Sequence, residues 1–156
     1  TMKTRILSLA LMLFMLCIVS SCRDQKTTNV AVTQDGIVMH KHDTIQVMNL
    51  VTEFMNALKN KEYANAVIML YEINPQSPYD EPELLDNEKI EKTLDGLKKF
   101  PIRNFEFKDF TFTKAYDNLV RFDVELDSQS QNTEPIKVVF ALKPVRYLGE
   151  WRLCLK

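Results

Sequence analysis

The spacing of apolar residues changes near Pro101, and this change constrains the fold of the 156-residue chain more than any other feature. Before Pro101, apolar residues recur every three or four positions, as in Val47, Val51 and Leu58, which is the period of an amphipathic helix. After it, LVRFDVELD, residues 119–127, alternates apolar and polar side chains, which indicates a half-buried antiparallel strand. Helices that precede strands are typical of the α+β class, with the helices on one face of the sheet.

Helices are predicted over residues 43–60, 61–71 and 86–99 from the same spacing rule. Between the last two, residues 73–82 contain three prolines and no periodicity, which indicates a loop, because each proline removes an amide donor. We expect Ile90, Leu94 and Leu97 to face inward from the third helix.

Strands are predicted over residues 105–113, 119–127, 136–142 and 151–155, with a turn from Pro144 to Gly149. If the first of them, FEFKDFTFT, were a straight strand, two of its phenylalanines would lie on one face and two on the other. A bulge near Lys108-Asp109 would bring all four rings to one face and bend the strand.

Two segments resemble a known family. VMNLVTEFMNALKNKEYANAVIMLY, residues 47–71, looks like the opening helices of the nuclear transport factor 2-like superfamily, and GEWRLCLK, residues 149–156, looks like its last strand. The resemblance covers roughly residues 43–156. It implies one α+β domain in which three N-terminal helices pack on a curved four-stranded antiparallel sheet, as a cystatin-like cone. Cones of this superfamily often dimerise through the outer sheet face, where Val139 and Ala141 are expected here.

The N-terminal segment has the order of a secretory signal. Lys3 and Arg5 precede an apolar block from about residue 6 to residue 19, and Val19-Ser20-Ser21-Cys22 then resembles a bacterial lipobox. The resemblance implies that the sulfur of Cys22 receives a diacylglycerol through a thioether and that the signal is then cleaved just before Cys22, with palmitate expected among the fatty-acid chains. A transmembrane helix is the weaker alternative because the block is shorter than the roughly 20 residues of a bilayer span. An ordinary signal with a chance cysteine is another.

This interpretation divides the chain into a removed signal peptide (1–21), a lipidated tether (22–42) and one domain (43–156). It locates the protein in the cell envelope, at the outer membrane or the periplasmic face. Arg23 after the lipidated position favours the outer membrane by analogy with enteric lipoproteins. Within the tether, Asp35-Gly36 between short apolar runs is the signal of a tight hairpin, although lipoprotein tethers are usually disordered.

Composition excludes several functions. A formal net charge of −1 provides no large basic field for nucleic acid. The chain contains three glycines, and no GxGxxG, GxxxxGK or HExxH motif occurs in it. We therefore expect no cofactor and no nucleic-acid partner.

Two polar clusters are candidate metal sites. His40, His42 and Asp43 could bind Zn²⁺, but a solvated linker fits them better, and Asp43 with Gln46 also has the form of a capping box. The acidic stretch from Asp80 to Glu88 lacks the spacing of a calcium loop, and carboxylates at a helix N-terminus explain it better. The sequence thus predicts no metal site.

Aromatic side chains from the helices and strands could line a pocket inside the cone. The candidates are Phe54, Tyr63, Tyr71, Phe107, Phe122, Phe140 and Trp151. The inward strand positions carry no acid or base, since Asp123 and Glu125 lie on the opposite parity, which argues against an enzyme. Cys154 shares the face of Arg152 and is expected to be a partly exposed, inert thiol.

The sequence therefore predicts a lipid-anchored envelope module that binds a small hydrophobic molecule or an envelope protein. One alternative is a structural or assembly lipoprotein without a ligand. The least favoured is an isomerase- or dehydratase-like enzyme of the cone type. A homodimer through the sheet is compatible with each of these.

Overall fold

The computed structural model describes residues 31–32, 38–113, 116–127 and 134–155. Helices and strands follow in the order β1 (Ala31–Val32), β2 (Val38–Met39), α2 (Lys41–Lys59), α3 (Tyr63–Ile68), β3 (Leu70–Glu72), β4 (Glu83–Leu84), α4 (Asn87–Lys99), β5 (Ile102–Phe112), β6 (Asn118–Leu126), β7 (Ile136–Tyr147) and β8 (Glu150–Leu155). The signal peptide, Cys22 and most of the tether lie outside these residues.

One mixed sheet holds six strands in the order β4-β3-β8-β7-β6-β5. All neighbouring pairs are antiparallel except β3 and β8, which are parallel. The predicted fold class, a cone of three helices on a four-stranded antiparallel sheet, is therefore wrong in strand number and in strand direction. Of the three helices in the described residues, α3 has only six residues.

The error arises at the second predicted helix. Leu70 and Tyr71 fit the helical spacing of the residues before them, yet α3 ends at Ile68. The chain then extends because Leu70 pairs with Leu153 and Tyr71 with Cys154, across the free edge of β8. This tertiary pairing outweighs the local helical pattern.

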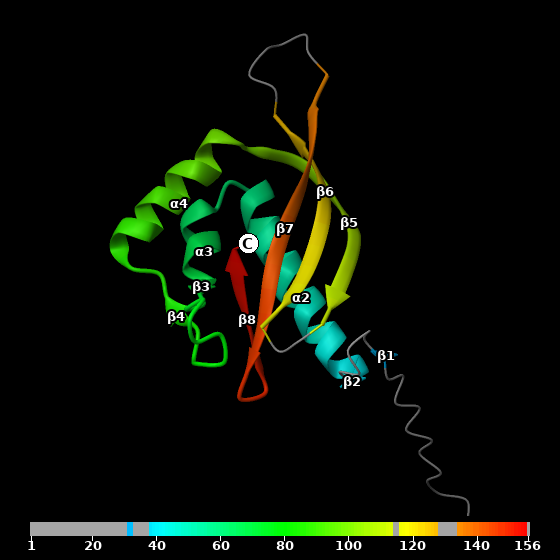
Figure 1. Cartoon of the computed structure of the whole chain (residues 1–156). Coiled ribbons are helices and arrows are strands. Elements are labelled where there is room, and N and C mark those ends of the chain that lie inside the picture. The colour runs from blue at the N-terminus through cyan, green and yellow to red at the C-terminus, as the bar shows by residue number, and fades with distance from the viewer. Residues whose placement is uncertain (1–30, 33–37, 114–115, 128–133, 156) are drawn as a thin grey trace, which may run out of the picture.

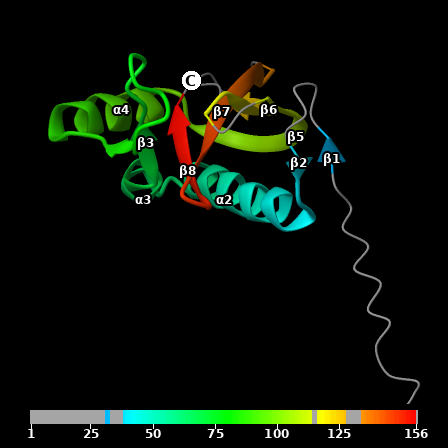
Figure 2. The same cartoon turned by 60° about the horizontal axis from the view of Figure 1, so that its bottom comes forward.

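The core lies between α2 and the concave face of the sheet (Figure 1). The predicted inward residues of α2, among them Val47, Val51 and Phe54, are fully buried. They pack on Val120, Phe122 and the other inward side chains of β6, whose alternation is confirmed. Figure 2 shows α2 under the sheet and α4 at the opposite end from β1 and β2.

The helix α2 begins earlier than predicted. Lys41 is its first residue, and the backbone N–H of His40 donates to Oδ2 of Asp43 at 3.2 Å. Asp43 is thus the third residue of the helix, where its side chain caps the N-terminus, and it does not precede the helix. The predicted Asp43–Gln46 capping box and the predicted linker over His40, His42 and Asp43 are both wrong.

The bulge in β5 is confirmed. The register shifts between the Phe107–Phe122 pair and the Asp109–Arg121 pair, which leaves Lys108 as the extra residue. All four phenylalanines of the strand consequently stand opposite inward-facing residues of β6. Only Phe112 is buried, and Phe107 is 45% exposed because β5 is an edge strand.

The last turn is shorter than predicted. β7 continues through Pro144 to Tyr147, and Tyr147 pairs directly with Glu150. The two residues between them, Leu148 and Gly149, have φ angles of 48° and 85°. Positive φ at both central positions matches the right-handed twist of a two-residue hairpin.

β1 and β2 pair as a separate antiparallel hairpin, with Val32 opposite Val38. The hairpin interpretation of the tether is therefore confirmed for its strands. The turn at Asp35-Gly36 lies outside the described residues.

Candidate ligand-binding pocket

An apolar pocket of about 580 Å³ lies beneath α4, where this helix faces the C-terminal end of β8 and the inner side of β6 and β7. Its lining comes from both helical and sheet elements: Leu58, Tyr63, Lys92, Thr93, Gly96, Leu97, Phe100, Ile102, Val124, Leu126, Val138, Phe140 and Leu155. The volume is within the range of about 300–1,000 Å³ that small-molecule sites occupy.

The pocket exists because α4 does not complete the core. This helix packs mainly against α3 and less closely against the sheet. None of its residues is fully buried, although Ile90, Leu94 and Leu97 face inward as predicted. An amphipathic helix normally buries its apolar stripe, so the half-covered stripe of α4 leaves an apolar surface open.

Polar contacts fix the position of the N-terminus of α4. Asp86 is the N-cap residue, and its Oδ1 accepts the backbone N–H of Lys89 at 2.8 Å. That hydrogen bond is the main reason why the pKa of Asp86 is lowered. Lys89 in turn reaches Glu72 of β3 at 2.7 Å, which raises the pKa of Lys89. α4 is thus held at its start while its C-terminal half spans the pocket.

Gly96 shows directly that space remains under α4. Apart from its chain neighbours and the backbone of its own helix, a Cβ atom added to this glycine would have no heavy atom within 4 Å. The floor of the pocket is formed by Val124 and Leu126, which are buried, whereas Phe100 at the rim is 63% exposed. The pocket is therefore closed on the sheet side and open at its rim near Phe100.

Apolar side chains dominate the lining of the pocket. Its polar side chains are Lys92, Thr93 and Tyr63, and none of the described lining residues is an aspartate, glutamate, histidine or cysteine. Apolar surface dominates, so the free energy of binding would come mainly from removing a ligand's apolar surface from water.

Of the predicted lining residues, Tyr63 and Phe140 line this pocket. Phe54 lies behind Phe140, with 6.3 Å between the ring centroids, and Phe122 is buried in the core. The remaining three lie elsewhere. Tyr71, in β3, lies near the loop that joins β3 to β4, Phe107 lies on the sheet edge and Trp151 lies near the start of α2.

Sequence reasoning missed the contribution of α4. Thr93, Gly96, Leu97 and Phe100 line the pocket, although the helix itself was predicted. A glycine between inward-facing residues of an amphipathic helix was the available signal, since a glycine inside a helix lowers its stability.

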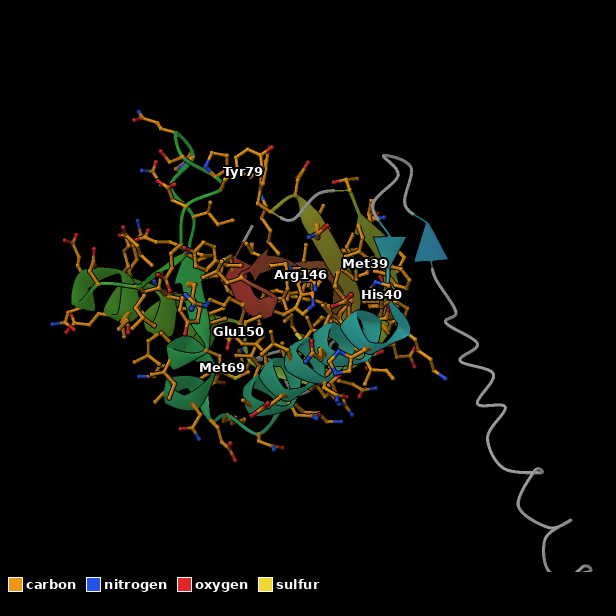
Figure 3. The ribbon with its side chains drawn as sticks, turned by 90° about the horizontal axis from the view of Figure 1, so that it is seen from below. Met39, His40, Met69, Tyr79, Arg146 and Glu150 are labelled. Carbon is orange, nitrogen blue, oxygen red and sulfur yellow. The ribbon has the colours of Figure 1, made fainter. Side chains whose placement is uncertain are left out.

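The predicted metal candidates do not form a site. His40, labelled in Figure 3, is the N-cap residue of α2. His42 is exposed, whereas Asp43 is buried. In the acidic stretch, Asp86 caps α4 and Glu81 pairs with Arg152 at 2.8 Å. Within the part of the chain that the structure describes, no three His, Cys, Asp or Glu side chains are grouped to hold a metal ion.

Cys154 differs from its prediction. It is only 2% exposed, and Pro75 and Pro78 of the segment after β3 lie on the same side of β8. Burial raises the pKa of its thiol to about 12.

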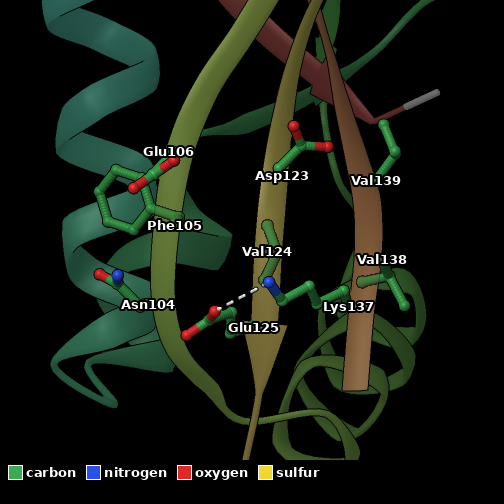
Figure 4. A pocket seen from close by; sticks show the side chains of 9 residues that line it. All are labelled: Asn104, Phe105, Glu106, Asp123, Val124, Glu125, Lys137, Val138 and Val139. Atoms are coloured by element: carbon green, nitrogen blue, oxygen red, sulfur yellow. Dashed lines mark ion pairs between the residues drawn. The ribbon is translucent and has the colours of Figure 1, made fainter. Parts of the chain in front are cut away.

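The outer face of the sheet carries charged and apolar side chains together (Figure 4). Asp123 and Glu125 point outward as predicted, and Glu125 lies 3.7 Å from Lys137. Arg121 binds Asp109 through two hydrogen bonds of 2.6 and 2.8 Å. Val139, expected in a dimer contact, is 51% exposed.

No family model matches the sequence, and no curated protein is significantly similar to it. Among the described helices, none is both long enough and apolar enough to cross a membrane.

Proposed function

We propose that this protein is a lipid-anchored module of the cell envelope that holds a small hydrophobic molecule beneath α4. The observation that carries the proposal is the apolar pocket of about 580 Å³ under a helix whose apolar stripe is only half covered. A bound apolar molecule would cover that stripe and supply the packing that the chain itself leaves incomplete.

The anchor in this proposal is Cys22, at the outer membrane or the periplasmic face. The residues that follow it lead to β1, β2 and the N-terminus of α2, whereas Leu58 near the other end of α2 lines the pocket. A helix rises about 1.5 Å per residue, so the 19 residues of α2 span about 28 Å between the end that follows the tether in the sequence and the end that lines the pocket.

Native mass spectrometry of the full chain, freshly isolated from its own envelope, tests the ligand. We expect a fraction of molecules to carry an extra mass of a few hundred daltons that organic extraction removes. A Gly96→Phe variant, whose ring would occupy the open space, should lose this mass and remain folded. A wild-type spectrum without any such mass would favour the alternative of a structural lipoprotein with no ligand.

Replacement of Cys22 tests the anchor separately. A Cys22→Ser chain should not incorporate labelled palmitate and should remain unprocessed, whereas a Cys17→Ser chain should behave like the wild type. Equal labelling of both variants would exclude Cys22 as the lipidated residue.

We also propose a protein contact on the outer sheet face. An exposed apolar side chain of β7 supports it, since Val139, which stands opposite the outward-facing Asp123, is 51% exposed. The partner on this face would be either a second copy of the chain, which gives a homodimer, or an envelope protein. Sedimentation of the full chain in density-matched detergent, with Val139→Glu as the disrupted variant, distinguishes a dimer from a monomer.

A further inference from the structure

We infer that the ligand of the pocket is a single-chain amphiphile with an anionic head group, held with its head at Lys92 and its chain on the apolar floor. This inference rests on the proposed ligand-binding function and adds the chemical class. Among the described residues of the lining, Lys92 is the one charged side chain.

The surroundings of Lys92 support this role. In the described residues, no carboxylate forms an ion pair with its Nζ, whereas Lys89 one turn earlier binds Glu72 at 2.7 Å. Glu88 and Asp95 lie four residues before and three residues after Lys92, at the spacings of helix surface neighbours, without reaching it. The ammonium group at the pocket rim is therefore available to an anion.

Neighbouring groups could complete the recognition of a head group. Thr93 and Tyr63 both line the pocket, and each hydroxyl is a hydrogen-bond donor. Beyond these groups, the lining consists of apolar side chains, from Leu97 on α4 to Val124 and Leu126 on the floor. An uncharged alkane would leave the donors unused, and a large polar ligand would lose its hydration against this floor.

The chemistry does not distinguish a carboxylate from a phosphate head group. Both accept hydrogen bonds from an ammonium group, and a lysine binds either one as a point charge. A free fatty acid and a single-chain phospholipid therefore share the predicted features, and competition experiments can distinguish the two sources.

Photo-crosslinking of the full chain in vesicles of neutral lipid tests the inference. The probes are a medium-chain fatty acid with a diazirine in its chain and the methyl ester of the same acid, which lacks the charge. Peptide mass spectrometry then measures labelling of Leu97, Val138 and Leu155. We expect the acid to label these pocket residues roughly fivefold more than the ester, the factor of a partly exposed ion pair.

Matched variants separate the head-group contact from general charge effects. Lys92→Met keeps the apolar stem and should remove the preference for the acid, whereas Lys98→Met, which removes a lysine of α4 outside the lining, should preserve it. Dodecanoate and dodecyl phosphate should both compete with the acid probe, and the stronger competitor identifies the head group. Dodecanol should compete weakly.

The outcomes distinguish this inference from the function on which it rests. Equal labelling by acid and ester that Gly96→Phe abolishes would overturn the anionic ligand and support the pocket. An unchanged preference in Lys92→Met would assign the anion to another group and overturn the role of Lys92. Absence of labelling at the pocket residues by either probe would overturn the proposed binding function itself.

Discussion

The indole Nε1 of Trp151 donates a hydrogen bond to Oδ1 of Asp43 at 3.3 Å, which joins the last strand to the first turn of α2. Arg146 lies 3.5 Å from the same oxygen, and the backbone of His40 bonds the other one. Asp43 is 3% exposed. One carboxylate thus caps α2 and holds it against the β7–β8 hairpin.

Replacement of Asp43 should destabilise the fold. Asp43→Ala would leave the indole N–H and the backbone N–H of His40 without their acceptor, at a cost of about 2 kcal/mol in the free energy of unfolding. Asp43→Asn retains an acceptor for Trp151 and should cost less. Urea denaturation of the full chain measures both, and the exposed residue Asp95 provides the control Asp95→Ala. An Asp43→Ala midpoint equal to that of the control would contradict this role.

Burial of Cys154 predicts a loss of stability at alkaline pH. The folded state raises the pKa of this thiol from 9.0 to about 12, mainly through burial, so the folded state retains the proton that the unfolded state releases. Stability should therefore fall by up to about 1.4 kcal/mol per pH unit above pH 9. A Cys154→Ala variant should lack this contribution, so the two urea midpoints should converge as the pH rises from 9 to 11. Parallel pH profiles would show that the thiol ionises equally in both states.

The same burial predicts that Cys154 is unreactive in the native protein. Thiolate is the nucleophilic form, and little of it exists at pH 8 when the pKa is about 12. Iodoacetamide should modify the Cys154 peptide only after urea is added. Rapid modification without urea would show that the β3–β4 segment does not cover this residue in solution.

Gly96→Ala should stabilise the protein by about 1 kcal/mol in the free energy of unfolding. A glycine inside a helix loses more conformational entropy than alanine, and the new Cβ has open space around it. Thermal unfolding measures the change, and Gly149→Ala should do the opposite because Gly149 has a φ of 85°. Destabilisation by Gly96→Ala would mean that α4 lies closer to the sheet than the structure shows.

Leu148→Asn should also stabilise the fold, by up to about 1 kcal/mol. Leu148 has a φ of 48° and is 86% exposed, so its side chain makes little packing contribution to offset a left-handed backbone. Asparagine tolerates this conformation, and Asn-Gly is the preferred pair of such hairpins. Leu84→Asn, at an exposed leucine of β4 without positive φ, is the control. A midpoint no higher than in the wild type would contradict the backbone argument.

The strands with clear alternation could be predicted from the sequence, and β6 shows why. Val120, Phe122, Val124 and Leu126 obey a period of two because one face of β6 packs on α2 and the other faces water. β3 could not be predicted, because its three residues owe their conformation to a parallel partner more than eighty positions away.

The candidate site was predicted in part. Tyr63 and Phe140 were chosen as aromatic residues on inward faces, and both line the pocket. An aromatic residue on an inward face can lie in the core or line the pocket, and its size does not tell which, so Phe122 was chosen as well, although it is buried under its neighbours. Which residues line the pocket depends on the distance between α4 and the sheet, and the amphipathic pattern of α4 does not specify this distance.

An experimental density map of the protein isolated from its native envelope tests the central claim most directly. The account predicts elongated density that the chain does not explain, between Leu97 of α4, Phe140 of β7 and Leu155 of β8, with one end near Lys92. A pocket closed by α4 resting on the sheet, or filled with ordered water alone, would contradict it.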